Sequence, residues 1–216
     1  AIEKSVGRRF GPEDGYLWVV GAEHAEAARR HLSHPVLAMP HVPDGRHDLR
    51  RCKHPDGKAC LPYELAQLKW PFALVHEVRR LHAAKLRMPK WFLLGDDDTY
   101  VHVPNLFLAI RRYEKPGENL WESLKVFGHR ASCRWFCGGT GVLLTAALAQ
   151  SFVLGYGDRY MRLMTDHVYA GTDTFYYDQQ LPQALQWVRG VEGVELNEME
   201  FRSPADQYCK GVRKPQ

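Results

Sequence analysis

The sequence predicts an α/β domain with a mostly parallel central sheet flanked by helices. Short apolar runs, typical of buried strands, alternate along the chain with stretches whose apolar residues recur at helical spacing, and this alternation favours parallel strands joined by helices. The chain has 216 residues, with no internal repeat and no low-complexity segment. This length suits one sizeable core better than two, so we expect a single domain spanning residues 1–216.

Three strands and two helical regions are predicted in the first hundred residues. The predicted strands are residues 16–20, 36–39 and 91–94. A helix is expected over the alanine-rich residues 22–32, and another over residues 63–86, where Pro71 should kink the helix or split it in two. Residues 40–62 hold proline, glycine, aspartate, histidine and arginine with little periodicity, which predicts a long basic surface loop.

The second half of the chain continues the alternation. Residues 104–113 are expected to form a short helix with Pro104 in its first turn. Residues 125–128 have the character of a strand. Residues 142–145 predict either a strand or the start of a helix that continues through residues 146–154.

The composition is that of a globular protein with a mild positive charge. Hydrophobic residues make up 45% and charged residues 25%, and the formal net charge is +4. This charge is too small to indicate nucleic-acid binding, and the basic run over residues 46–54 is interleaved with acids and lacks aromatic platforms, so we expect a solvated loop there. No run approaches the length of a membrane span, and no signal-peptide pattern opens the chain. Because the first residue is Ala1, we expect a processed or truncated product whose membrane anchor would lie upstream.

Five cysteines are present as two close pairs and one odd residue: Cys52 with Cys60, Cys133 with Cys137, and Cys209. Two disulfide-bonded loops of this size suit a secretory compartment. One alternative is a zinc site made of Cys52, His54 and Cys60, although this spacing matches no standard zinc finger. The other alternative is five free thiols, because spacing alone does not report redox state.

Three consecutive carboxylates, Asp96, Asp97 and Asp98, follow the predicted strand 91–94 after a single glycine. In open α/β sheets, ligands bind beyond the carboxyl ends of the strands. Adjacent like charges become favourable there if a divalent cation lies among them, and hard oxygen ligands suit Mg²⁺ or Mn²⁺, which in turn bind phosphate oxygens. The simpler alternative is a solvated acidic turn or a helix N-cap before Pro104.

Two segments carry a resemblance to a known family. Residues 90–101, KWFLLGDDDTYV, closely resemble the triple-aspartate segment of Fringe-like β1,3-glycosyltransferases, glycosyltransferase family 31. Residues 135–145, WFCGGTGVLLT, resemble the aromatic–Gly-Gly-Ala-Gly segment of that family, with Thr140 at the alanine position. The order and spacing of the two segments are similar to the family's, and the resemblance covers about residues 63–201.

The resemblance implies a GT-A fold, a UDP-sugar donor, Mn²⁺ (or Mg²⁺) and inversion at the anomeric carbon, with a glycan or glycoprotein acceptor and a β1,3 linkage. Residues 1–103 would form the donor-binding half and residues 104–216 the acceptor and catalytic half. The family also implies the lumen of the secretory pathway, either the Golgi, as part of a type II membrane protein, or secretion. Asp98 would ligate the metal, and Asp96 and Asp97 would face the ribose of the donor or support the metal, with Asp96 as a further candidate ligand.

The second segment supplies further candidate residues. Gly138 and Gly139 either form a glycine-rich turn or let the backbone approach the donor closely, and both roles are compatible. Thr140 is a candidate acceptor contact. The faces of Trp135 and Trp121 suit stacking on sugar rings, although packing in the core is the commoner role of such side chains.

An inverting transferase needs a general base that removes the proton of the acceptor hydroxyl. Family members carry this carboxylate in an acidic-Asp-Val-x-x-Gly segment at the start of a helix. Asp178 keeps the aspartate, with Pro182 at the glycine position, and the sequence after it resembles the end of the family. Pro182 should lie in a first helical turn, so we place Asp178 near a helix N-terminus, where it is either the base or only a cap. Asp166, which lies upstream of a matching valine and glycine, is the runner-up.

The chain departs from the family pattern at Tyr177, Pro182 and Arg202. Arg202 stands where the family has a metal-binding histidine, and a guanidinium cannot ligate a cation, although it can bind a diphosphate. These departures support an alternative function, that of a catalytically silent relative that binds nucleotide or glycan without turnover.

Overall fold

The computed structural model describes residues 15, 17–32, 34–95, 103–128, 141–171 and 177–196. Contacts divide the chain into two compact units, one formed by Ala1–Arg80 with Tyr156–Tyr177 and the other by Leu81–Gly155 with Asp178–Gln216. We call them the first and second units. Their limits fall inside three helices, α4 (Lys69–Ala83), α6 (Ala146–Ala170) and α7 (Tyr177–Leu185), so each of these helices contributes residues to both units. The expected single domain, with halves that meet near residue 103, stays a prediction.

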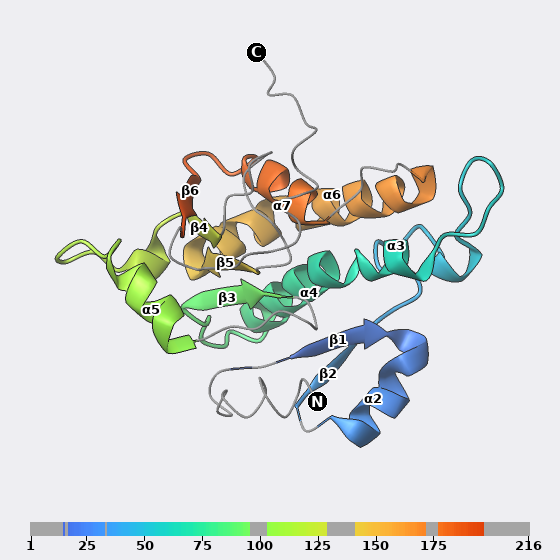
Figure 1. The fold of residues 1–216 in the computed structure, drawn as a ribbon, viewed down its shortest axis with the longest axis horizontal. Coiled ribbons are helices and arrows are strands. Elements are labelled where there is room, and N and C mark those ends of the chain that lie inside the picture. Colours follow the sequence, from blue (N-terminus) through green and yellow to red (C-terminus); the bar gives the residue numbers. More distant parts are fainter. Residues whose placement is uncertain are drawn as a thin grey trace, which may run out of the picture. The chain divides into compact units, whose positions relative to one another are not determined.

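The first unit begins with a strand–helix–strand segment (Figure 1). Strands β1 (Trp18–Gly21) and β2 (Val36–Met39) pair in parallel, with Trp18 opposite Val36. A short 3₁₀ turn, η3 (Ala22–His24), and helix α2 (Ala25–His31) lie between them, and α2 carries the alanines that favour a helix over this stretch. The predicted strands and helix are therefore confirmed to within two residues.

The predicted loop after β2 contains a 3₁₀ turn, η4 (Leu49–Arg51), and a small hairpin in which Lys53 pairs with Ala59. The hairpin turns at His54-Pro-Asp-Gly57, where the N–H of Gly57 donates to the carbonyl of His54 and Gly57 has φ of 86°. Proline at the second position and glycine at the left-handed position are the residues that such a turn requires.

The expected helix over residues 63–86 is split. Helix α3 (Pro62–Ala66) and helix α4 (Lys69–Ala83) are separated by two residues. Pro71 is the third residue of α4, a position where its missing N–H costs no intrahelical hydrogen bond. The break therefore comes just before the first turn that contains the proline, as the sequence indicates.

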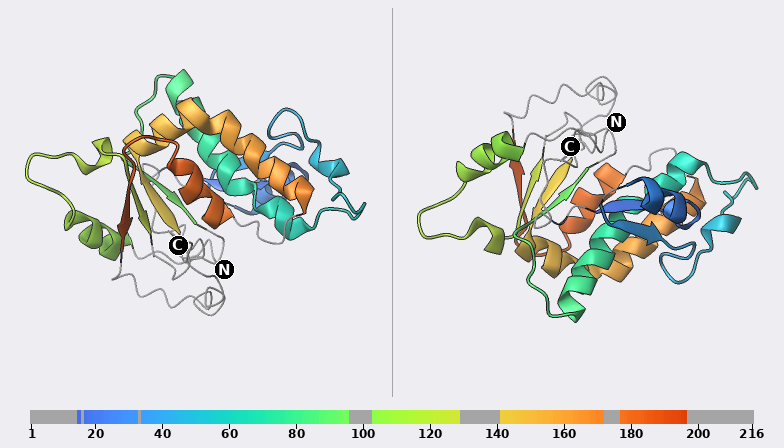
Figure 2. Two further views of the ribbon diagram at one scale, coloured as in Figure 1. Left: turned by 90° about the horizontal axis from the view of Figure 1, so that it is seen from above. Right: turned by 90° about the horizontal axis from the view of Figure 1, so that it is seen from below.

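The second unit holds a four-stranded sheet in the order β3-β5-β4-β6 (Figure 2). Its strands are β3 (Trp91–Leu94), β4 (Lys125–Gly128), β5 (Val142–Thr145) and β6 (Glu192–Glu195). Strand β5 is antiparallel to both β3 and β4, and β4 is parallel to β6. The open choice for residues 142–145 is thus settled as a strand.

The expectation of a mostly parallel central sheet is wrong for these described strands, although the α/β class is confirmed. Two of the three pairings in the four-stranded sheet are antiparallel. The physical reason lies in the connections. Parallel neighbours need a crossover, usually a helix, whereas no stretch of helical periodicity separates β4 from β5. The sheet is therefore mixed, and its GT-A character is not established by topology.

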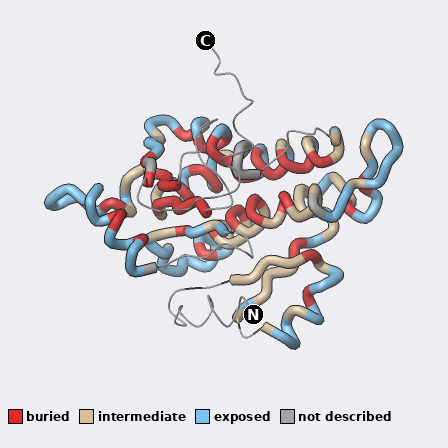
Figure 3. The backbone as a smooth tube through the Cα atoms, viewed as in Figure 1, coloured by how far each residue is buried: buried red, intermediate tan, exposed pale blue. Residues whose placement is uncertain are grey.

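Helix α5 (Val103–Arg111) packs on one face of this sheet. The buried residues of this cluster come from α5, from η5 (Leu120–Glu122), from the sheet and from the residue after β6: Leu106, Ala109, Ile110, Leu120, Phe127, Leu143, Val194 and Leu196. The residues that alternate with Phe127 and Leu143 along the strands, Val126, Val142 and Leu144, are also buried, so the opposite face of β4 and β5 is covered as well. Figure 3 shows buried residues concentrated in the long helices and in β4 and β5, whereas β1 and β2 are mostly half-buried.

Helix α6 (Ala146–Ala170) follows β5 directly and is 25 residues long. The sequence predicted its first nine residues as helix and missed the rest, because Gly155 and Gly157 interrupt the pattern there. Helix α7 (Tyr177–Leu185) contains Pro182. Among the described residues, no helix combines the length and the apolar character needed to cross a membrane.

Candidate functional site

One edge of the four-stranded sheet joins the segments that carry the sequence motifs. Leu94, the last residue of β3, pairs with Val142, the first residue of β5. Val142 also pairs with Gly128 at the end of β4, and Gly128 pairs with Glu195 at the end of β6. These four residues form a row across the sheet, which we call the motif edge.

The chain leaves or enters the sheet at the motif edge in all four strands. The acidic tip, Asp96–Asp98 by sequence, begins two residues after Leu94, and Thr140 stands two residues before Val142. The described residues from which the two segments continue, Leu94 and Val142, are therefore direct partners in this row.

Most of the predicted site residues lie outside the described part of the chain: Asp96, Asp97, Asp98, Trp135, Gly138, Gly139, Thr140 and Arg202. The second cysteine pair, Cys133 and Cys137, and the odd Cys209 lie outside it as well. Their assigned roles stay predictions. Trp121 is described, and the ammonium group of Lys90 lies 3.8 Å from the centroid of its ring, a contact that already occupies one face of this indole.

Asp178 is the second residue of α7, so the prediction that it lies near a helix N-terminus agrees with the described backbone. The expectation for Pro182 is wrong, because it is the sixth helical residue and lies in the second turn. Proline lacks an N–H, so the carbonyl of Asp178 receives no helical hydrogen bond from Pro182. The first turn of α7 therefore has one hydrogen bond fewer than the first turn of a helix without proline.

Asp166, the runner-up, lies in the C-terminal part of α6, not at the start of a helix. Its carboxylate accepts a hydrogen bond from Nη2 of Arg46 at 3.0 Å, and Nε2 of His47 lies 3.7 Å away. The matching glycine, Gly171, directly follows α6 with φ of 61°, which is the usual conformation of a residue that ends a helix. The similarity of this stretch to the family segment is therefore explained by helix termination.

A buried carboxylate lies beside Asp166. The side chain of Asp44 has no exposed surface, and it accepts hydrogen bonds from the backbone N–H groups of Arg46 and His47 and from the hydroxyl of Thr165. Nδ1 of His47 lies 2.7 Å from its second oxygen. Burial by itself would raise the pKa of Asp44, but these hydrogen bonds outweigh it and hold the pKa well below its usual range.

The loop–helix contact is completed by a tyrosine. The hydroxyl of Tyr169 donates to the carbonyl of Asp48 at 2.8 Å, and its ring packs on that of His47 with centroids 4.6 Å apart. Burial and the nearby carboxylates of Asp48 and Asp44 raise the pKa of Tyr169. No signal in the sequence predicts this cluster, because the partners are about 120 residues apart and no motif links them.

Two of the four arginine and lysine side chains in the basic run over residues 46–54 are paired with carboxylates. Arg50 forms two hydrogen bonds to the carboxylate of Asp48, at 2.9 and 2.7 Å, which lower the pKa of Asp48 to about 2. Arg46 pairs with Asp44 and Asp166. A guanidinium held by a carboxylate is a poor phosphate ligand, so the structure supports a solvated loop here.

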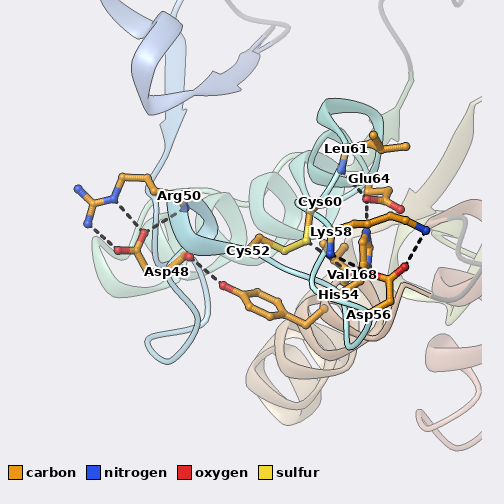
Figure 4. The surroundings of a disulfide bond; sticks show 11 residues. Asp48, Arg50, Cys52, His54, Asp56, Lys58, Cys60, Leu61, Glu64 and Val168 are labelled. Atoms are coloured by element: carbon orange, nitrogen blue, oxygen red, sulfur yellow. Dashed lines mark hydrogen bonds and ion pairs between the residues drawn. A yellow bond between two sulfur atoms is a disulfide. The ribbon is translucent and has the colours of Figure 1, made fainter.

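The first cysteine pair is joined in the described hairpin (Figure 4). Cys52 and Cys60 form a disulfide whose Cα atoms are 5.4 Å apart, and this confirms the first predicted bond. The Sγ atom of Cys60 lies 3.9 Å from the carbonyl oxygen of Val168 in α6. A disulfide sulfur has no proton to donate, so this is a packing contact that places the disulfide against α6.

His54 and Glu64 lie next to this disulfide (Figure 4). Nε2 of His54 is 3.0 Å from a carboxylate oxygen of Glu64, which also accepts the backbone N–H of Leu61 at 2.6 Å. The other ring nitrogen, Nδ1, is buried and has no hydrogen-bond partner within the described ranges. A Cβ atom on Gly171 would lie 2.2 Å from Nδ1, so the ring fits only against a glycine.

No protein-family model matches this chain, and a search of curated proteins finds no significant match either.

Proposed function

We propose that this chain is an inverting glycosyltransferase that moves a sugar from a UDP-sugar donor to an acceptor hydroxyl with the help of a divalent metal, forming a β1,3 linkage. The proposal rests on the resemblance of two segments to Fringe-like β1,3-glycosyltransferases. The disulfide between Cys52 and Cys60 supports an oxidising compartment, and we propose the Golgi lumen, with a glycan or glycoprotein as the acceptor.

The motif edge is the single observation that carries the proposal. The acidic segment and the glycine segment are 40 residues apart in sequence, yet the strands they flank begin or end in one paired row, Leu94 opposite Val142. Beyond Glu195, the chain also continues toward Arg202 from this row. A nucleotide-sugar is contacted at its diphosphate, its sugar and its nucleoside, so a site that binds it needs several segments brought to one place.

The carboxylate ligands of the acidic tip suit a hard cation. Three carboxylates offer only oxygen ligands, the preference of Mn²⁺ and Mg²⁺. Asp98, with Asp96, would hold the metal, and Asp97 would face the donor. Bound there, the metal would supply positive charge against the departing diphosphate. Arg202 would add a second positive group that binds the diphosphate through two parallel hydrogen bonds.

We assign the general base to Asp178. It stands at the start of α7, the position that the family pattern gives to this carboxylate, whereas Asp166 stands near the end of α6 and is bound by Arg46. The positive end of the helix dipole favours an ionised carboxylate. Asp178 would accept the proton of the acceptor hydroxyl as its oxygen attacks the anomeric carbon.

The glycine segment would complete the site. Gly138 and Gly139 would let the backbone approach the donor, since they carry no side chain. Trp135 would stack on the acceptor sugar and Thr140 would hydrogen-bond to it.

The test is a panel of UDP-sugars, each with and without Mn²⁺, scored by protection against thermal unfolding. A donor present at 100 times its dissociation constant stabilises the folded state by about 2.7 kcal/mol. We expect such protection only with metal, and we expect Asp98→Ala to abolish it without unfolding the protein. Asp158→Ala is the matched control, because Asp158 is an exposed carboxylate on α6 paired with Arg79. Undiminished metal-dependent protection in Asp98→Ala would exclude the assigned ligand.

A catalytically silent relative is the second candidate. It is favoured by Pro182, which lies inside α7 four residues after the proposed base and removes one of its helical hydrogen bonds. Such a protein would bind UDP with metal but would transfer sugar to no acceptor. Measuring UDP release alongside binding therefore separates the two candidates.

A further inference from the structure

Four potential zinc ligands lie together in the first unit, on the hairpin of residues 52–60 and on the helix that follows it. Cys52 and Cys60 are the two ends of the hairpin, His54 lies at its turn, and Glu64 is in α3. The potential ligand atoms of His54, Cys60 and Glu64 all lie within 4.8 Å of one another. Among the described residues, these three form the group of histidine, cysteine and acidic side chains that is close enough to hold one metal ion. Cys52 is bonded to Cys60 and therefore belongs to the same cluster, which we call the hairpin cluster.

The sulfur atoms of this cluster are not free to bind metal in the oxidised chain. Zinc binds thiolates, and a disulfide sulfur carries no thiolate charge. Disulfide and zinc are therefore two mutually exclusive ways to close the same hairpin.

We propose that reduction of the Cys52–Cys60 disulfide creates a zinc site whose ligands are Cys52, Cys60, His54 and Glu64. A dithiol supplies two electrons, the sulfur–sulfur bond breaks, and the dithiol becomes a disulfide while the protein gains two thiols. Zn²⁺ then displaces one proton from each thiol to solvent and binds the two thiolates, the imidazole and the carboxylate. The site is separate from the motif edge and does not depend on the proposed transferase activity.

The distances in the hairpin cluster are close to those of a tetrahedral zinc site. Nε2 of His54 and Oε2 of Glu64 are 3.0 Å apart, and two nitrogen or oxygen ligands of one zinc are separated by about 3.3 Å at the usual bond lengths. Two thiolates on one zinc are about 3.8 Å apart. Once the disulfide is broken, rotation of the two cysteine side chains on an unchanged hairpin can provide this separation.

The backbone around the cluster is already fixed by contacts that do not involve the disulfide. The N–H of His54 donates to the carbonyl of Lys58 at 2.8 Å, and the N–H of Gly57 donates to the carbonyl of His54 at 2.9 Å. The imidazole ring packs against Gly171, which leaves no room for a Cβ. This contact holds the Nδ1 side of the ring against the end of α6 and directs Nε2 to Glu64, so the ring needs no reorientation to bind zinc through Nε2.

Ligand chemistry selects zinc over the metal proposed for the acidic tip. Two thiolates and an imidazole are soft or intermediate ligands, which favour Zn²⁺ over Mn²⁺ or Mg²⁺. The carboxylate of Glu64 is 27% exposed and the ring of His54 13% exposed, so the site would be shielded from water on most sides, as structural zinc sites are.

The experiment measures zinc binding to the full chain in oxidised and reduced form. The other three cysteines, Cys133, Cys137 and Cys209, are changed to serine in all samples so that they offer no competing thiolate. A phosphine serves as the reductant, because dithiols themselves bind zinc; the phosphine becomes its oxide, with water as the source of oxygen and protons. We expect one more Zn²⁺ per chain after reduction than before it, because the acidic tip can bind Zn²⁺ in both forms, and we expect Co²⁺ to give the intense absorption of a tetrahedral thiolate complex only after reduction.

Single substitutions identify the ligands. His54→Gln and Glu64→Gln should each weaken zinc binding by at least 10- to 100-fold, the loss that removal of even an outer partner of a metal ligand produces. His76→Gln is the control, because Nδ1 of His76 is also buried without a hydrogen-bond partner in the described structure, but no thiol or carboxylate clusters with it. Equal zinc binding by the oxidised and reduced chains, or equal affinity of all three variants, would overturn the proposal.

A second measurement covers variants that fold poorly when reduced. Zinc should protect Cys52 and Cys60 from alkylation in the reduced chain, as mapped by mass spectrometry, and this protection should disappear in His54→Gln. Alkylation of both cysteines at the same rate with and without zinc would also contradict the proposal.

Discussion

Asp44 shows how a single charged side chain is made stable inside the first unit. Its carboxylate is fully buried, and it accepts hydrogen bonds from two backbone N–H groups and from Thr165, with the guanidinium of Arg46 as its ionic partner. A buried charge without such partners would be strongly unfavourable. The network therefore joins the loop to α6 by hydrogen bonds, beside the packing of Tyr169 on His47.

Asp44→Asn should lower the free energy of unfolding by about 1–3 kcal/mol, because the amide removes the charge and leaves donors imperfectly paired. Urea denaturation at neutral pH measures this loss. Asp158→Asn, at an exposed ion pair with Arg79, is the control and should change stability by less than about 1 kcal/mol.

The same substitution predicts a pH dependence. The folded-state pKa of Asp44 lies below the value of about 3.9 expected for an unfolded chain. Its stabilising contribution is therefore complete above that pH and is lost as the pH falls toward the folded-state pKa. The difference in stability between the wild-type chain and Asp44→Asn should be present at neutral pH and should shrink below about pH 4. A difference that grows in acid would mean that the carboxyl group is protonated in the fold.

Asp178 and Asp166 are distinguished by kinetics. Asp178→Asn should keep donor and metal binding but lower kcat by about 10²–10⁴-fold, the usual contribution of a general base. Asp166→Asn should have a much smaller effect, since this carboxylate is bound by Arg46. The reverse ranking, measured with one donor and one acceptor, would assign the base to Asp166.

At the scale of elements, α6 shows that two glycines in or beside one helix can have opposite effects on stability. Gly155 lies inside the helix with nothing near enough to contact a Cβ, whereas Gly171 follows its last residue with φ of 61° and faces the ring of His54. The first glycine weakens the helix, and the second ends it and accommodates the histidine.

Gly171→Ala should therefore lower the free energy of unfolding by at least about 1–3 kcal/mol, because alanine is strained at positive φ and its methyl group would clash with His54. Gly155→Ala should raise the free energy of unfolding by about 0.5–1 kcal/mol, the helix preference of alanine over glycine. Thermal unfolding of the two variants measures both effects. Equal effects of the same sign would show that backbone conformation does not distinguish the two positions.

Elements of the described fold were predictable where a local pattern decides them. Strands β2, β3 and β4 match the sequence prediction at both ends, and α3 and α4 separate next to Pro71 as expected. The length of α6 was not predictable from periodicity, since its two internal glycines mask a helix that is held by burial of residues such as Phe152 and Met164.

At the scale of the whole molecule, strand direction was beyond the sequence pattern. Apolar runs identify strands but not their partners, and β4 and β5 are antiparallel while β4 and β6 are parallel. The candidate site likewise has one part that is visible in the local sequence and one part that depends on long-range pairing. The acidic and glycine segments were recognisable by themselves, whereas the row that unites Leu94, Val142 and Gly128 depends on pairing between distant strands.

The position of β3 at one end of the described sheet has a consequence for solubility. An edge strand offers unpaired backbone groups to other chains, and residues 91–94, Trp-Phe-Leu-Leu, are apolar. Charges that flank such a strand act as gatekeepers against self-pairing. The acidic tip would therefore keep molecules apart whether or not it binds a metal.

Changing Asp96, Asp97 and Asp98 together to asparagine should cause self-association at concentrations where the wild-type chain is monomeric by light scattering. Repulsion between neighbouring molecules would then be a second, non-catalytic reason for three adjacent carboxylates at the end of this strand.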